Sequence, residues 1–136
     1  MITNVWLVVC LLSVSTPVFA QDDILKKSIF FGGGSYYVDD VQRDELQDFI
    51  QSVDRIQNYE VIIFSHTDNI GGKEYNAWLS QMRSEAVEQQ LHQFDVPEEL
   101  IKIRDFGLTN PLYTNTSHDG RIMNRRVDVI LWPIVF

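Results

Sequence analysis

Short apolar segments alternate with amphipathic ones along the chain, and this pattern predicts a small α/β domain. Four segments have the composition of strands bounded by turn formers, namely residues 28–31 (extending back to about residue 24), 59–65, 101–106 and 126–132. The second of these is apolar on both faces, which is typical of a strand in the middle of a helix-covered sheet. The order βαβαβ plus a final strand predicts a two-layer α/β sandwich with a mixed four-stranded sheet.

Two segments between the predicted strands have helical periodicity. Asp39 or Asp40 is placed to cap the first helix, whose apolar face comprises Leu46, Phe49, Ile50, Val53 and Ile56. The second helix follows a turn-rich stretch at 66–73, and its predicted buried stripe comprises Tyr75, Trp78, Leu79, Met82, Ala86 or Val87, and Leu91. Residues 108–124 are predicted to form the longest irregular segment.

Residues 1–20 differ from the rest because they contain no Lys, Arg, Asp or Glu and include an apolar run at 5–12. This layout predicts a cleaved secretory signal peptide followed by one domain at residues 21–136. An uncleaved membrane anchor is the alternative, but polar residues and a proline interrupt the roughly 20 apolar positions that a spanning helix needs. The single cysteine, Cys10, lies inside this leader, so the mature domain is expected to lack disulfides.

Every charged side chain follows residue 20, so the formal net charge of −8 belongs to the predicted mature domain. This charge limits the classes of ligand that the domain is expected to bind. This charge disfavours nucleic acid, whose phosphates attract basic surfaces, and anionic lipid. A ligand that carries an ammonium group is electrostatically favoured. His66, His92 and His118 lack metal-ligand spacing, and no serine lies in a nucleophile elbow. We therefore expect no metal, no cofactor and no enzymatic activity.

Polar residues cluster where the second predicted strand ends. Residues 66–69 follow that strand, at the edge where open α/β sheets place their ligands. Gly71 and Gly72 then permit a tight turn into the second helix. Within that helix Asn76, Ser80 and Arg83 share one face because they are spaced by three and four residues.

Three motifs, HTD at 66–68, YNxxLSxxR at 75–83 and NRRV at 124–127, resemble those of OmpA-like peptidoglycan-binding domains. That family includes the carboxyl-terminal part of outer-membrane protein A, the peptidoglycan-associated lipoprotein and flagellar stator proteins. The resemblance covers about residues 28–131 in the family's order and spacing. It implies the OmpA-like fold and a ligand, the diaminopimelate residue of the peptidoglycan stem peptide.

The resemblance also assigns residues to this ligand. It implies that Asp68 binds the diaminopimelate ammonium and that Arg83 binds a carboxylate, a role that suits the planar fork of arginine. Without ligand these two side chains could pair with each other. Further candidates by the same resemblance are Asn76, Phe31, Thr67, Asn69 and Arg125.

The sequence departs from the family pattern at two places, and some motif residues have structural alternatives. Ser65 stands where the family often has glycine, and Gly32 stands where it often has an aspartate that helps to hold the ammonium. Asp68 could instead cap its own turn, and Arg83 could be an ordinary surface arginine. We expect His66 to be structural and residues 124–126 mainly to brace loop 108–118, with one arginine lining the ligand groove as the alternative.

The sequence thus predicts noncovalent peptidoglycan binding in the periplasm, with association with the outer membrane left open. A second hypothesis is a structural adaptor of an envelope machine, such as a flagellar motor or secretion system, that contacts a partner protein through residues 132–136. A third, a cell-wall hydrolase, lacks paired carboxylates or metal ligands in the sequence.

Overall fold

A computed structural model of the chain describes residues 23–107 and 113–135. In chain order its elements are β1 (Leu25–Phe30), α1 (Asp40–Gln51), η1 (Ile56–Asn58), β2 (Tyr59–His66), α2 (Lys73–Gln93), η2 (Glu98–Leu100), β3 (Ile101–Gly107), α3 (His118–Asn124) and β4 (Arg126–Pro133). The predicted order of strands and helices is confirmed. The predicted signal peptide lies outside the described residues.

The four strands form one mixed sheet in the order β1-β4-β2-β3. β4 pairs antiparallel with both β1 and β2, while β2 and β3 are parallel. The register aligns Ile29 with Val127 and Ile63 with both Val129 and Ile103. Because side chains at paired positions point to the same face of a sheet, these residues form a continuous apolar surface.

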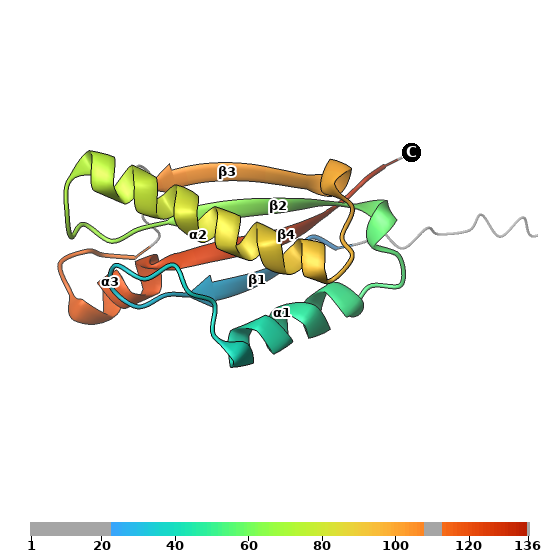
Figure 1. The fold of residues 1–136 in the computed structure, drawn as a ribbon, viewed down its shortest axis with the longest axis horizontal. Helices are drawn as coiled ribbons and strands as arrows, with labels where there is room; N and C mark the ends of the chain where they lie inside the picture. The colour runs from blue at the N-terminus through green and yellow to red at the C-terminus, as the bar shows by residue number, and fades with distance from the viewer. Residues whose placement is uncertain (1–22, 108–112, 136) are drawn as a thin grey trace, which may run out of the picture.

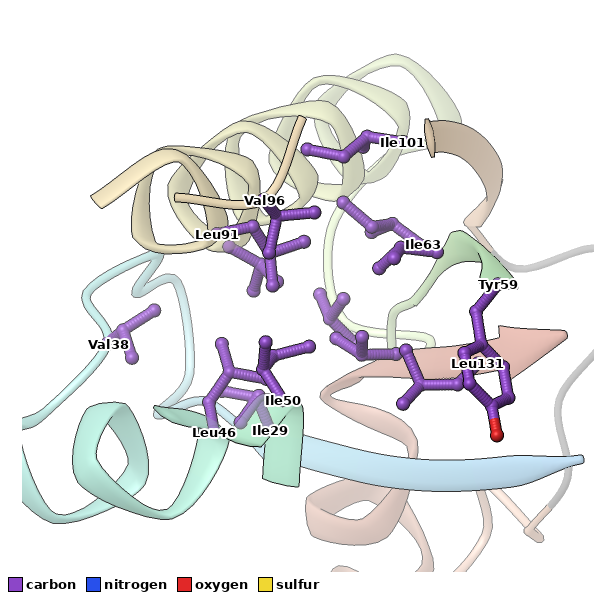
Figure 2. Close-up of a cluster of buried hydrophobic side chains, with 14 of the residues drawn as sticks. Ile29, Val38, Leu46, Ile50, Tyr59, Ile63, Leu91, Val96, Ile101 and Leu131 are labelled. Atoms are coloured by element: carbon purple, nitrogen blue, oxygen red, sulfur yellow. The ribbon is translucent and has the colours of Figure 1, made fainter. Parts of the chain in front are cut away.

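The helices α1 and α2 lie on one face of this sheet, α1 beside β1 and α2 across β2 and β3 (Figure 1). The core between the two layers includes fully buried Ile29, Leu46, Ile63 and Leu91 (Figure 2). Asp39 caps α1 by accepting a hydrogen bond from the backbone N–H of Gln42, as predicted. Among the described residues, no helix is long and apolar enough to cross a membrane.

The predicted buried stripe of α2 is partly wrong. Tyr75 and Trp78 are 44% and 46% exposed, and Met82 is half-buried. The buried residues are Asn76, Leu79, Ser80, Arg83, Ser84, Val87 and Leu91. The amino-terminal half of α2 therefore buries a largely polar face, which a search for apolar periodicity cannot detect.

One helix boundary and one additional helix also differ from the sequence prediction. α1 ends at Gln51, so Val53 and Ile56 pack against the core from the segment that follows the helix. α3 forms within the stretch that was predicted to be irregular. This helix was not predicted because it is short and contains a glycine at position 120. Ser117 caps it by accepting a hydrogen bond from the backbone N–H of Gly120.

Candidate functional site

A pocket of about 100 Å³ lies where β2 ends and α2 begins. Its described lining residues come from four parts of the chain: Gly33, Gly34, Asp68, Ile70, Tyr75, Leu79, Arg83 and Arg125. The fold brings these parts together because β1 and β2 both run towards this end of the sheet, while β4 starts from it (Figure 1). The two residues expected to form the site, Asp68 and Arg83, both line this pocket.

Asp68 is almost fully buried and uses both carboxylate oxygens. Its Oδ1 accepts a hydrogen bond of 3.0 Å from the backbone N–H of Ile70, which is the turn-capping role considered from sequence. Its Oδ2 lies 3.2 Å from Nη1 of Arg125. The pairing of Asp68 with Arg83 considered from sequence is therefore not observed, because the guanidinium that contacts this carboxylate is that of Arg125.

Arg83 is fully buried and is not the ordinary surface arginine that the sequence alone allowed. Its Nε donates to the carbonyl oxygen of Ser35 at 2.8 Å and its Nη2 to that of Gly32 at 3.0 Å. The ring of Phe31 lies against the guanidinium, with its centroid 5.2 Å from Cζ. Nη1 of Arg83 is also buried and has no hydrogen-bond partner among the described residues.

The charges around the pocket act on Arg83. Burial lowers the pKa of Arg83 to about 10, while the charge of Asp68 raises this pKa and that of Arg125 lowers it. At neutral pH the guanidinium therefore stays protonated. One carboxylate and two guanidiniums give the pocket a local excess of positive charge within an acidic protein. The buried, incompletely paired guanidinium of Arg83 favours an anionic group nearby.

Arg125 is held beside β1 as well as beside Asp68. Its Nε donates to the carbonyl oxygen of Phe31 at 3.2 Å, and its carbonyl oxygen accepts from the N–H of Phe31 at 2.9 Å. Asn124, the residue before Arg125, accepts a hydrogen bond from the N–H of Tyr113 and donates one to its carbonyl oxygen. Within the NRRV motif, Asn124 thus braces the segment after residue 112, whereas Arg125 lines the pocket.

Tyr75 forms one wall of the pocket and is held by two glycines with positive φ. A Cβ at Gly71 would lie 2.7 Å from Cδ1 of Tyr75, and one at Gly34 would lie 3.1 Å from its hydroxyl. Larger residues at these glycines would displace the ring or strain the backbone. Sequence reasoning assigned Tyr75 to the core, and the two glycines at turns are the signal that could have placed it here.

The remaining candidate residues surround the pocket without lining it. Asn76 is buried, and its Nδ2 lies 3.4 Å from the carbonyl oxygen of Gly71, so it braces the turn before α2. Thr67 is buried and its N–H donates to the carbonyl oxygen of Gly107, while Asn69 is exposed. Phe31 contacts both arginines, Arg83 through its ring and Arg125 through its carbonyl oxygen.

A buried polar cluster lies next to the site, centred on Asp128 of β4. Asp128 accepts hydrogen bonds from the hydroxyl of Ser28 at 2.6 Å and from Nε of Arg126 at 3.2 Å. Nε2 of His66 lies 3.3 Å from the same carboxylate, so His66 bonds to a neighbouring strand. Among the described residues, no group of His, Cys, Asp and Glu is arranged to hold a metal ion. We assign His66 a structural role.

Asp128 should make the stability of the fold depend on pH. Burial raises the pKa of Asp128, but the hydrogen bonds from His66 and Ser28 and the charge of Arg126 outweigh it and lower the pKa from 3.8 to about 2. The charged form therefore stabilises the fold above about pH 4, and this stabilisation of about 2 kcal/mol is lost as the pH falls towards 2. Urea unfolding of wild type and Asp128→Asn at several pH values measures it.

We expect the difference in unfolding free energy between these two proteins to be largest at neutral pH and to shrink between pH 4 and pH 2. Asp48→Asn, at an exposed position of α1, is the control and should follow wild type throughout. A difference that stays constant down to pH 2 would show that the charge of Asp128 does not contribute.

Comparisons with known proteins identify the family. The model of the OmpA family matches residues 30–125. The outer-membrane lipoprotein YfiB of Pseudomonas aeruginosa is 28% identical over 107 residues, which cover 79% of this chain and 64% of YfiB. The chain therefore spans less than two thirds of that relative.

Two solved structures share the fold. The peptidoglycan-associated lipoprotein from Burkholderia pseudomallei is 29% identical with a TM-score of 0.71, over 76% of this chain and 88% of that one. The cell wall anchor of the T6SS from Pseudomonas aeruginosa is 25% identical with a TM-score of 0.66, over 82% and 83% of the two chains. The family resemblance inferred from the three motifs is confirmed, and this chain belongs to the OmpA family.

Proposed function

We propose that this domain binds peptidoglycan noncovalently, through the diaminopimelate residue of the stem peptide. The observation that carries the proposal is the small pocket lined by one carboxylate, Asp68, and two guanidiniums, Arg83 and Arg125. Diaminopimelate ends in an ammonium and a carboxylate on one carbon, so the pocket complements both charges. Two similar structures, a peptidoglycan-associated lipoprotein and a cell wall anchor, support the same ligand class.

Binding would exchange one ion pair for two. The ligand ammonium takes the place of Arg125 against Oδ2 of Asp68, which frees the Arg125 guanidinium within the pocket. The ligand carboxylate then approaches Nη1 of Arg83, the donor of that guanidinium with no partner among the described residues. Arg83 and Arg125 line the same pocket, so both guanidiniums can share this carboxylate.

The glycines at 32–34 contribute through their backbone. The carbonyl oxygen of Gly32 holds Nη2 of Arg83, and that of Ser35 holds Nε. The guanidinium is thereby fixed with its third nitrogen towards the ligand. Although Gly32 replaces a family aspartate, this segment thus keeps a role in the site by orienting Arg83.

A noncovalent role also agrees with the groups in the pocket. Asp68 is the one carboxylate among the described residues that line it, whereas glycoside hydrolysis ordinarily needs two. We place the domain in the periplasm, where a signal peptide at residues 1–20 would deliver it. The similarity to YfiB, an outer-membrane lipoprotein, supports a location in the cell envelope.

The proposal is tested by sedimentation with purified sacculi of the diaminopimelate type. We expect the domain to pellet with the sacculi and to be released by an excess of free stem tripeptide that contains diaminopimelate. No soluble muropeptides should appear during the incubation. Protein that stays in the supernatant, or a pellet that the tripeptide does not release, would contradict the proposal.

A second candidate function is an adaptor that links the wall to an envelope assembly. Trp132 is 48% exposed and Val135 is 92% exposed, at the end of β4 opposite the pocket (Figure 1). A partner bound there would leave the pocket free for peptidoglycan. Photo-crosslinking from position 132 in cells tests this candidate, and crosslinks no more abundant than those from exposed position 48 would argue against it.

A further inference from the structure

Three exposed aromatic side chains form a contiguous cluster beside the pocket. Tyr36, Tyr75 and Trp78, which we call the aromatic strip, are 43%, 44% and 46% exposed. The ring of Trp78 lies 5.9 Å from that of Tyr36 in an edge-to-face arrangement at 85°. It also lies 5.9 Å from the ring of Tyr75 at 36°. Single exposed aromatic residues are common, but a cluster leaves a connected apolar surface in water and indicates a binding site.

The aromatic strip connects two cavities. Tyr75 lines the pocket that contains Asp68 and Arg83, at one end of the strip. Tyr36, at the other end, lines an open groove of about 240 Å³ together with Tyr37, Val38, Ala86, Gln89 and Gln90. The strip is therefore continuous with the proposed diaminopimelate site, because Tyr75 belongs to both. A longer ligand bound at that site can extend over the three rings.

The chemistry of the strip matches a sugar better than a purely apolar partner. Flat ring faces pack against the C–H face of a pyranose, and tyrosine hydroxyls, the indole N–H and glutamine amides bond to hydroxyl and acetamido groups. The groove supplies two such amides, from Gln89 and Gln90. An uncharged N-acetylated sugar also avoids repulsion by the acidic protein.

The rings are held in place before any ligand binds. Gly71 and Gly34 lie close to Tyr75. The ring of Trp78 lies between those of Tyr36 and Tyr75 and contacts both. Binding therefore immobilises few additional side chains, which lowers its entropic cost. Such a fixed surface is suited to a rigid ligand such as a glycan.

We propose that the aromatic strip binds the glycan of peptidoglycan, at the N-acetylated sugars nearest the bound stem peptide. This inference rests on the proposed function, because the diaminopimelate pocket places the ligand. Two residues of the stem and the chain of diaminopimelate itself separate the bound end from the lactyl group of the sugar, and the two residues alone span about 7 Å when extended. The strip begins at the wall of the pocket, so the sugar is within reach of Trp78 and Tyr36.

The test compares two ligands by calorimetry: the diaminopimelate-containing tripeptide alone and the same tripeptide attached to its disaccharide. We expect wild type to bind the disaccharide-tripeptide at least tenfold more tightly than the tripeptide. Trp78→Ala should reduce this ratio to about one and leave the affinity for the tripeptide unchanged. Trp78→Phe, which keeps a flat ring, should retain most of the ratio.

Trp132→Ala is the matched control, since Trp132 has a similar exposed fraction at the far end of the sheet. It should behave as wild type with both ligands. A wild-type ratio near one, or equal weakening of both ligands by Trp78→Ala, would overturn the glycan site while leaving the peptide site intact. Failure of wild type to bind the tripeptide would instead contradict the proposed function.

Discussion

Replacing Asp68 with asparagine is expected to weaken binding of the diaminopimelate tripeptide by about 30-fold to several-thousandfold, which corresponds to roughly 2–5 kcal/mol. Asparagine has almost the same shape but no charge, so the ligand ammonium would enter the pocket without an anion. Arg125 would lose its carboxylate partner in the free protein as well. Calorimetric titration of the two proteins with the tripeptide measures the loss.

Asp48→Asn removes the same charge from an exposed position of α1 and serves as the control. It should bind the tripeptide as wild type does, because the pocket needs a carboxylate at one position and not merely a more negative protein. Circular dichroism of Asp68→Asn should show a folded domain. If the folded variant bound within threefold of wild type, Asp68 would not be the ammonium site.

Arg83→Lys is expected to be the second most damaging substitution. Lysine keeps the positive charge but has a single nitrogen, which cannot hold the carbonyl oxygens of Ser35 and Gly32 and also meet a ligand carboxylate. We expect tripeptide affinity to fall at least tenfold. We also expect the unfolding free energy to fall by about 1–3 kcal/mol, because a charge-assisted hydrogen bond to a carbonyl oxygen is lost.

Arg104→Lys makes the same substitution at an exposed position of β3 and should change neither quantity. The two measurements are urea unfolding without ligand and calorimetry with it. Full tripeptide affinity in Arg83→Lys would mean that the ligand carboxylate does not need the Nη1 donor of Arg83. Unchanged stability would mean that the two carbonyl contacts contribute nothing to the fold.

The fold could be predicted from the sequence because most elements follow simple patterns. β2 and β4 are rich in β-branched residues, and α1 has both a capping aspartate and an apolar stripe. α2 could not be oriented correctly, because its first half buries Asn76, Ser80 and Arg83 against the site while Trp78 faces solvent. On this half of α2 the face towards the pocket thus reverses the usual distribution of polar and apolar residues.

The site could be predicted only in part. Motif spacing identified Asp68 and Arg83, and both line one pocket. The pairing of Asp68 with Arg125 could not be predicted, since it depends on the hydrogen bond that holds the backbone of Arg125 against that of Phe31. The role of Tyr75 was also missed, because it depends on the positive φ angles of Gly34 and Gly71 and not on helical periodicity.

The Asp68–Arg125 pair has a consequence for affinity. In the free protein Asp68 and Arg125 are mostly buried and pair with each other, while the charge of Arg83 is left over. In the proposed binding mode the ligand breaks this pair, and part of its interaction energy is used in doing so. We therefore expect modest affinity for the tripeptide alone, which the proposed contacts of the glycan with Trp78 and Tyr36 would strengthen.

The central claim is that the pocket recognises the ammonium and the carboxylate together. It is tested most directly by calorimetry with two stem tripeptides that differ only in their third residue, diaminopimelate or lysine. Lysine has the ammonium but lacks the carboxylate that Arg83 is proposed to bind. The account predicts at least tenfold tighter binding of the diaminopimelate tripeptide, and equal affinity for the two peptides would contradict it.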